Sequence, residues 1–257
     1  MELRDSRTQG VTPSFEQALG AANEVEGWLT DAQARRLWER ASEVPPDGRV
    51  VEIGSFRGRS TIILALAVPD GAEVVAIDPH TGTDRGPQQW VTSEALGEGD
   101  RRAFARNLER AGVSDRVRYV RRRSQEALEA VQRPIDLLYV DGAHRYRPVR
   151  DDLAGWGDRV RSGGSLLVHD AFSSIGVTLA LLRLMVFGSG WSWRGREGSL
   201  AEYRREVVRG AARLHGSLRQ LGQLPWFARN LLIKLALLAR MRRVARLLGH
   251  RSGPWPY

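Results

Sequence analysis

Residues 49–60 read RVVEIGSFRGRS, and this stretch decides the fold of the chain. Its first six residues are mostly apolar and end in glycine, as expected for a short buried strand followed by a tight loop. The following stretch STIILALAV (60–68) predicts a helix. A strand, a glycine loop and a helix in this order are typical of a parallel α/β sheet.

The same alternation continues along the chain. We predict further strands at 73–78, 117–121, 135–141 and 163–170, and helices at 14–43 (with Thr30 or Asp31 as a cap), 100–112, 125–131, 149–156 and 176–187. We predict two last strands, or a strand and a helix, at residues 191–193 and 199–206. We predict that residues 207–248 are helical, with a break near Pro225. The predicted fold is therefore α/β: a Rossmann-like, doubly wound, mostly parallel seven-stranded sheet.

Charge divides the chain into parts. The net charge is +9, but residues 191–257 contain 14 basic and 3 acidic side chains, and no carboxylate side chain follows Glu206. The single lysine, Lys234, lies among arginines in this part. We predict an N-terminal helical segment (1–45), a central α/β domain (46–206) and a basic helical C-terminal extension (207–257).

The composition excludes several classes of protein. The chain contains no cysteine, so disulfides and thiolate metal sites are excluded. The N-terminal residues MELRDSRTQG have no apolar run, and no stretch of 18 uncharged apolar residues occurs. We therefore expect neither a signal peptide nor a transmembrane helix, and a cytoplasmic protein.

The glycine loop argues against a dinucleotide. Gly54 and Gly58 have the spacing G-x-x-x-G, whereas a pyrophosphate cofactor needs the tighter G-x-G-x-x-G. Glu52 adds a negative charge beside the loop, which suits a cation. Asp78 ends the next strand, where it could accept hydrogen bonds from two ribose hydroxyls. This combination fits an adenosine that carries a sulfonium and an amino acid, although a tight turn without ligand and a capping Asp78 are the structural alternatives.

Four segments in order, VVEIGSFRGRST, AIDPH, LLYVDGAHRY and GGSLLVHDAF, resemble class I S-adenosylmethionine-dependent methyltransferases. More narrowly, they are similar to the metal-dependent sugar and macrolide O-methyltransferases, a group that includes macrocin and mycinamicin O-methyltransferases and cephalosporin-hydroxylase-like proteins. The resemblance covers roughly residues 25–190. It implies a methyltransferase that uses Mg²⁺ or Mn²⁺.

The resemblance also implies roles for single residues. For the methionine part of S-adenosylmethionine, the resemblance implies contacts with Glu52, Gly54 and Gly58, and it implies that Ser55 and Ser60 bind the methionine carboxylate. It implies that Asp78 binds the ribose. It also implies that Ser124 and Gln125 contact the edge of the adenine ring. The family's proposed base corresponds to His144, and its acidic metal ligands correspond to Asp141 and Asp170.

The same acids follow from chemistry. Asp141 and Asp170 end two predicted neighbouring strands, and two carboxylates side by side repel each other unless a cation or a proton lies between them. A metal there would lower the pKa of a bound hydroxyl, and His144 could accept its proton. This chain has His169 where the family often has another acid, so His169 is either a third ligand that favours Mn²⁺ or a structural residue.

The sequence says least about the acceptor, the molecule that receives the methyl group. We expect a sugar or oligosaccharide, either a polysaccharide such as a methylated mannoside chain or an antibiotic sugar. Trp191 and Trp193 could form a platform for it or belong to the core. Residues 224–248 could contact a membrane surface, pack on the catalytic domain or a second subunit of a dimer, or bind nucleic acid, which is the least favoured. An RNA methyltransferase and a non-enzymatic membrane-surface protein with the same fold remain alternatives.

Overall fold

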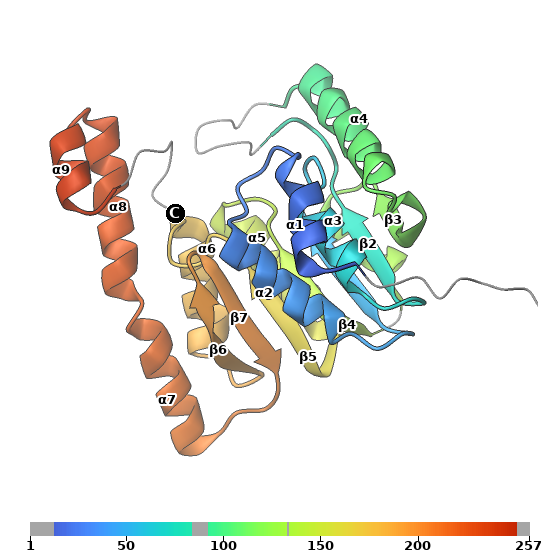
Figure 1. The fold of residues 1–257 in the computed structure, drawn as a ribbon. Helices are drawn as coiled ribbons and strands as arrows, with labels where there is room; N and C mark the ends of the chain where they lie inside the picture. The colour runs from blue at the N-terminus through green and yellow to red at the C-terminus, as the bar shows by residue number, and fades with distance from the viewer. Residues whose placement is uncertain (1–12, 84–91, 133, 251–257) are drawn as a thin grey trace, which may run out of the picture.

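A computed structural model describes residues 13–83, 92–132 and 134–250. Its centre is a seven-stranded sheet with the strand order β3-β2-β1-β4-β5-β7-β6 (Figure 1). The strands are β1 (Arg49–Ile53), β2 (Glu73–Ile77), β3 (Val117–Val120), β4 (Ile135–Val140), β5 (Val160–Val168), β6 (Trp191–Glu197) and β7 (Leu200–Arg205). The first five strands pair in parallel, and β7 runs antiparallel to both β5 and β6. The predicted fold class is confirmed.

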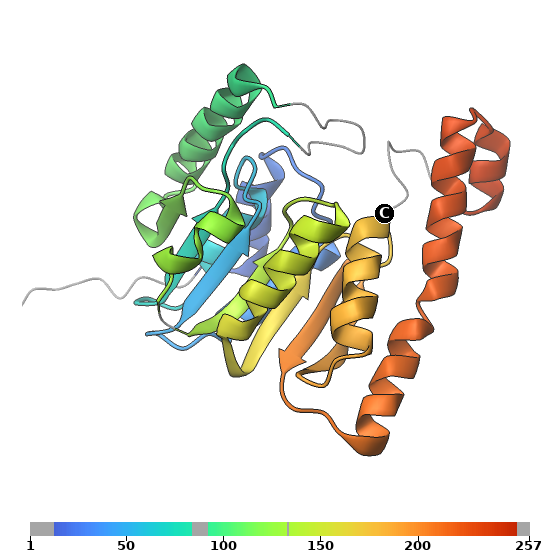
Figure 2. The ribbon, with the colours of Figure 1, turned by 180° about the vertical axis from the view of Figure 1, so that it is seen from behind.

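Helices cover both faces of this sheet, as seen from opposite sides in Figures 1 and 2. They are α1 (Phe15–Asn23), α2 (Asp31–Ser42), α3 (Arg59–Ala67), α4 (Glu94–Arg110), α5 (Tyr146–Gly155), α6 (Ile175–Leu181), α7 (Gly210–Leu221), α8 (Leu224–Leu238) and α9 (Arg242–Leu247). Alternate strand residues enter opposite cores: Val50 packs with α1, α2 and α3, whereas Val51 packs with α5 and α6. Burial on both faces explains why the strand sequences are almost continuously apolar.

Three predicted helices differ from the observed ones. The segment 14–43 forms two helices because Thr30 starts α2 with a capping box, in which its hydroxyl accepts a hydrogen bond from the backbone of Gln33. Residues 125–131 form two 3₁₀ turns, Ser124–Glu126 and Leu128–Ala130, instead of an α-helix. The segment 176–187 is α6 followed by a π-helical turn, Leu182–Val186.

The C-terminal extension forms a rod of helices beside β6 and α6 (Figure 2). Its α7 ends at Leu221 and α8 begins at Leu224 with Pro225 in its first turn, so the predicted break is confirmed. No helix within the described ranges is long and apolar enough to cross a bilayer. The polar N-terminus, on which the signal-peptide expectation was based, lies outside the described residues. The predicted domain boundaries stay predictions.

Candidate active site

The residue after each of four parallel strands continues the ladder of backbone hydrogen bonds, which aligns these residues at one edge of the sheet. The bonds run from the N–H of Gly54 to Ile77 O (2.9 Å), from Asp78 to Val120 O (3.2 Å), from Asp141 to Ile53 O (2.8 Å) and from His169 to Val140 O (2.9 Å). Ligands of parallel α/β sheets bind at this edge. The sheet therefore collects the predicted site residues in one place.

Gly54 brings two of these strand ends into direct contact. Its φ is +88°, and a Cβ at this position would lie 2.2 Å from the carbonyl oxygen of Asp141. No residue with a side chain fits there without moving the loop that carries Asp141. The glycine loop can therefore approach the end of β4 this closely only because residue 54 has no side chain.

The carboxylate of Asp78 organises the glycine loop. Its Oδ2 accepts a hydrogen bond from the backbone N–H of Phe56 (2.9 Å), and its Oδ1 accepts one from the backbone N–H of His80 (2.7 Å). The buried His80 imidazole contacts the Phe56 carbonyl and the Tyr119 hydroxyl, each at 2.6 Å. Asp78 thus lies at the expected strand end, beside the loop, and its contact with a ribose stays a prediction.

Glu52 lies beneath the loop. It is fully buried, and its two oxygens accept hydrogen bonds from Ser60 and Thr61 at the start of α3. Burial raises the pKa of Glu52 to about 7 although both hydroxyls lower it. In this structure Glu52 therefore supports the loop and the start of α3, together with the buried Ser55; a direct contact with a ligand stays a prediction for both.

Ser124 and Gln125 follow β3 and meet a carboxylate that the sequence did not single out. Both side chains donate hydrogen bonds to Oδ1 of Asp152 on α5, and the Gln125 bond is 2.8 Å long. The Trp156 indole donates to the Ser124 carbonyl (3.1 Å). Burial raises the pKa of Asp152 to about 7. The predicted adenine edge is therefore a small polar cluster that includes Asp152.

The ends of β4 and β5 bring four predicted side chains together. His169 Nδ1 lies 3.2 Å from Asp141 Oδ1 and 3.7 Å from Asp170 Oδ1, and His144 Nε2 lies 2.5 Å from Asp170 Oδ2. The Tyr139 hydroxyl donates to Asp141 Oδ2 (2.8 Å), a contact that sequence reasoning missed. The two carboxylates thus share one imidazole, and His169 points between them.

Three ionisable groups of this cluster, His144, His169 and Asp170, have shifted pKa values. Burial alone lowers the pKa of the His169 imidazole, but Asp141 and Asp170 outweigh it and raise the pKa to about 9. Burial also disfavours ionised Asp170, yet His144, His169 and Lys234 hold its pKa well below its usual range. Asp170 in turn raises the pKa of His144 against the effect of burial. The cluster is therefore built from two histidine–carboxylate contacts, His144 with Asp170 and His169 with Asp141.

These donors do not converge as a metal site. Among the described residues, no group of three or more His, Asp or Glu side chains is placed to hold a metal ion. Each carboxylate that was expected to bind Mg²⁺ or Mn²⁺ instead faces a histidine. An enclosed space of about 10 Å³ beside Asp141, His144 and His169 has room for about one water molecule. It is therefore too small to be the cofactor site.

The C-terminal extension reaches the same site. The loop after β5 holds Asp170 and Phe172 at φ values of +56°, and α8 packs against this loop. Lys234 Nζ donates to the Ser173 carbonyl (2.8 Å), and Asn230 Nδ2 donates to the Phe172 carbonyl (3.4 Å). Lys234 is thus a site residue that only its rarity in the sequence could have suggested.

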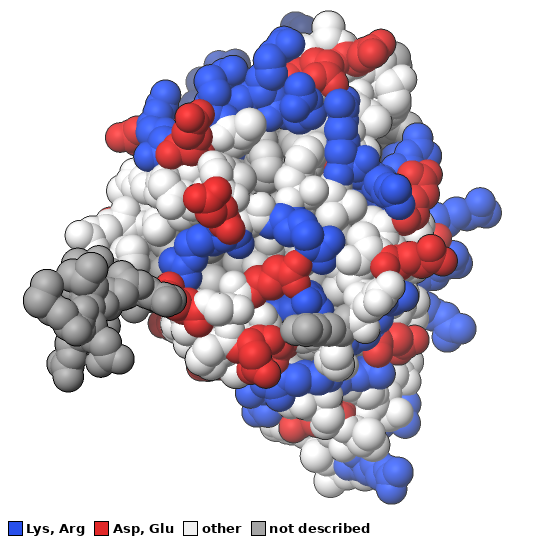
Figure 3. All heavy atoms as spheres, turned by 90° about the vertical axis from the view of Figure 1, so that its right-hand side faces the viewer, with Lys and Arg blue, Asp and Glu red and all other residues white. Residues whose placement is uncertain are grey.

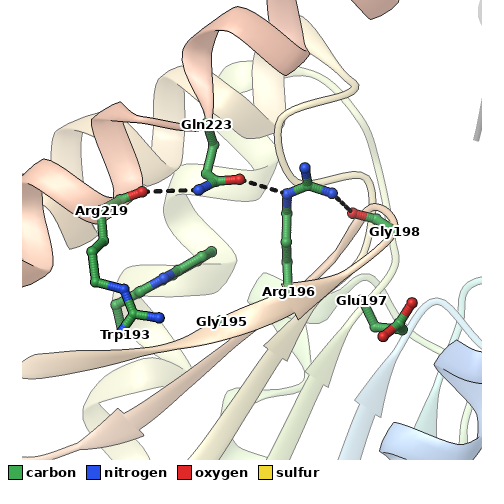
Figure 4. A pocket seen from close by; sticks show the side chains of 7 residues that line it. All are labelled: Trp193, Gly195, Arg196, Glu197, Gly198, Arg219 and Gln223. Atoms are coloured by element: carbon green, nitrogen blue, oxygen red, sulfur yellow. Dashed lines mark hydrogen bonds between the residues drawn. The ribbon is translucent and has the colours of Figure 1, made fainter.

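A second hollow, of about 610 Å³, opens near the turn between β6 and β7, as seen in Figure 4. It is lined by Trp193, Gly195, Arg196, Glu197, Gly198, Arg219 and Gln223. Arg196 spans it, donating to Gln223 Oε1 (2.8 Å) and to the Gly198 carbonyl (2.6 Å). Ser199, in the same turn, accepts a hydrogen bond from Ala171 N (2.9 Å), so the hollow lies on the edge of the sheet that carries Asp170.

Comparisons with known proteins agree with this geometry. Residues 51–171 match the family model described as a methyltransferase domain. One similar solved structure is a Corynebacterium glutamicum protein with 14% sequence identity and a TM-score of 0.58, and the match covers 76% of this chain and 91% of that one. Another is NovP, an O-methyltransferase with 19% identity and a TM-score of 0.55, for which the match covers 70% of this chain and 81% of that one. Cofactor-bound Rv0187 from MTB is also similar, with 22% identity and a TM-score of 0.52, and the match covers 80% of this chain and 94% of that one. At these identities the structures show a shared fold. Residues 51–171 are therefore similar to a methyltransferase domain, and the chain has the fold of these solved structures.

Proposed function

We propose that this protein is an O-methyltransferase that transfers the methyl group of S-adenosylmethionine to a sugar hydroxyl, with His144 as the general base. The observation that carries the proposal is the 2.5 Å contact between His144 Nε2 and the buried Asp170. A carboxylate on one ring nitrogen fixes the tautomer and leaves the other nitrogen, Nδ1, as the proton acceptor. His144 lies at the end of β4, beside the edge where the cofactor is expected.

The proposed reaction is a single in-line displacement. The acceptor oxygen forms a bond with the methyl carbon as the bond between carbon and sulfur breaks, and the electron pair of that bond goes to sulfur. The sulfonium becomes the neutral thioether of S-adenosylhomocysteine. The hydroxyl proton passes to His144, and Asp170 stabilises the imidazolium that results.

Transfer to oxygen is supported by two of the structural neighbours. NovP is named an O-methyltransferase, and so is a Bacillus cereus protein in complex with SAH (18% identity, TM-score 0.50). A sugar acceptor is supported by the polar hollow, whose arginine, glutamate and glutamine side chains can hydrogen-bond hydroxyl groups. The tryptophan platform is not supported, because Trp191 and Trp193 are each 8% exposed and belong to the core.

The test of the base is His144→Ala. We expect turnover to fall at least about 100-fold, because general-base catalysis contributes that much or more. Affinity for S-adenosylhomocysteine, measured by calorimetry, should change little. His215→Ala on the exposed surface of α7 is the matched control and should keep full activity. A parallel loss of turnover and cofactor affinity in His144→Ala, or full activity, would remove His144 from the base role.

Metal dependence stays a separate prediction, and no step above passes through a metal. The donor types of Asp141, His169 and Asp170 suit Mg²⁺ or Mn²⁺, but their arrangement as ion pairs does not favour either ion. If the resemblance to metal-dependent enzymes holds in function, EDTA should abolish methyl transfer and added Mg²⁺ should restore it. Full activity in EDTA would show that the imidazole–carboxylate pairs work without a metal.

A further inference from the structure

Helix α8 exposes a continuous apolar stripe. Its inner face is covered: Asn230 and Ile233 have no exposed surface, and Ala236 is 6% exposed. Its outer face exposes residues three or four positions apart, namely Pro225, Ala228, Leu232, Leu235 and Ala239, with Leu238 beside them. The three leucines are 52%, 53% and 64% exposed. Positions with this spacing lie on one side of a helix, so the stripe forms one surface.

Basic side chains flank the end of this stripe. Helix α9 folds back on α8, with Ala245 buried against it, and exposes Arg242, Arg243 and Arg246. Met241 (51%) and Leu247 (87%) extend the apolar surface. The chain has no acidic side chain after Glu206 to neutralise these arginines. The opposite side of the molecule, shown in Figure 3, differs because acidic and basic side chains are interspersed there.

We propose that α8 and α9 bind the surface of an anionic lipid bilayer. An exposed leucine stripe next to exposed arginines matches the two parts of such a surface, acyl chains and negative headgroups. A second copy of this chain matches it less well, because two extensions that are both basic would repel each other where they meet. With 15 residues, α8 is about 22 Å long and would lie flat in the headgroup region.

This orientation would bring the active-site edge towards the membrane. The inner face of α8 holds the loop after β5 through Asn230 and Lys234, while the outer face would contact lipid. The inference is independent of the acceptor, because it concerns only where the protein is held.

The test is co-sedimentation of the full-length protein with vesicles of phosphatidylcholine alone or with 30% phosphatidylglycerol. We expect binding only to the anionic vesicles, weakened by salt. Leu232→Gln/Leu235→Gln and Arg242→Gln/Arg243→Gln should each weaken binding about tenfold or more. Both pairs are exposed, and circular dichroism with thermal melting should show that the variants remain folded.

Matched controls lie on α4, at the far side of the sheet (Figure 1). Arg102→Gln/Arg106→Gln removes the same charge, and Leu96→Gln removes an exposed leucine; neither should change binding. Equal losses in the controls, or no binding to anionic vesicles at low salt, would overturn the proposal. So would a dimer in light scattering that Leu232→Gln/Leu235→Gln splits, or RNA binding that Arg242→Gln/Arg243→Gln weakens while vesicle binding is unchanged.

Discussion

His169 changes the character of the acidic site. In the group of enzymes that the sequence resembles, a second acid often precedes the position of Asp170, whereas this chain places an imidazole 3.2 Å from Asp141 and 3.7 Å from Asp170. These two carboxylates raise the pKa of His169, which favours a positive charge between them. A histidine at this position repels the two carboxylates less than a further acid would, and the role of His169 as a metal ligand stays a prediction.

Glu52 makes folding stability depend on pH. Its pKa rises from the ordinary 4.5 to about 7 on folding, so the folded chain holds a proton that the unfolded chain releases between these values. Below pH 4.5, Glu52 therefore has no effect on the free energy of unfolding. As the pH rises from 4.5 to about 7, Glu52 lowers the free energy of unfolding by about 3 kcal/mol in total. Glu52→Gln should remove this loss and be more stable than the wild type at pH 8, as measured by urea unfolding.

Asp152 provides the control for this measurement. Its pKa also rises to about 7 on folding, from 3.8, so it lowers stability over a similar range. Asp152→Asn should remove a comparable share of the pH dependence, and the double variant should remove more than either alone. If Glu52→Gln leaves the slope of stability between pH 5 and pH 7 unchanged, Glu52 is not the buried acid that the structure indicates.

Residues at strand ends could be predicted from the sequence, whereas their partners could not. Parallel strands end at one edge of a sheet, so the sequence predicts that Asp78, Asp141 and Asp170 lie near one another. Asp152 was missed because its partners Ser124 and Gln125 lie on another element, and helical periodicity does not reveal such a contact. Tyr139 was missed because its position inside a strand marks it as core.

At the scale of elements, the sequence predicts whether a segment is a helix or a strand better than it predicts the residues at which the element begins and ends. The parallel strands were each foreseen within a few residues, because short apolar runs between glycine and polar turns are clear signals. Helix α4 begins at Glu94, six residues before the predicted start, with Ser93 as its cap. The missing helix at 125–131 has a tertiary cause: Ser124 and Gln125 are bound to Asp152, which holds that segment in tight turns.

The glycine loop shows how an element is fixed by its neighbours. Arg57 pairs with Asp100 of α4 (2.9 Å) and with Glu26 from the segment between α1 and α2. The Phe56 and Trp28 rings lie 5.5 Å apart. Two separate segments therefore hold the loop that, together with Glu52 and Asp78, suggested a sulfonium cofactor. The loop motif could be found in the sequence, but its anchors could not, because they are ordinary surface residue types.

At the scale of the whole molecule, the basic extension is continuous with the active site. Gln220 of α7 contacts the Tyr203 hydroxyl (3.1 Å), and the Trp226 ring of α8 stacks on Arg196 (3.9 Å from the guanidinium carbon to the ring centroid). Farther along α8, Asn230 and Lys234 reach the loop that carries Asp170. The matched methyltransferase domain ends at residue 171, so this support comes from outside it.

Lys234 is the residue through which the extension should affect catalysis. Its ammonium group binds the Ser173 carbonyl and helps to keep Asp170 ionised. Lys234→Met keeps an unbranched apolar side chain but removes the donor and the charge. The loop should then shift and turnover should fall about tenfold, since small displacements of catalytic groups have effects of this size or larger. Steady-state kinetics should show the loss in kcat, with the KM for S-adenosylmethionine nearly unchanged.

Two comparisons separate positioning from general stability. Arg106→Met removes a basic side chain from the exposed surface of α4 and should leave kcat unchanged. Lys234→Arg restores the charge and a donor, and should recover part of the lost activity even if it packs less well. If Lys234→Met lowers the melting temperature while the folded protein keeps its full kcat, then α8 only stabilises the domain. If kcat falls and Lys234→Arg recovers it, the catalytic loop is completed by a helix outside the methyltransferase domain.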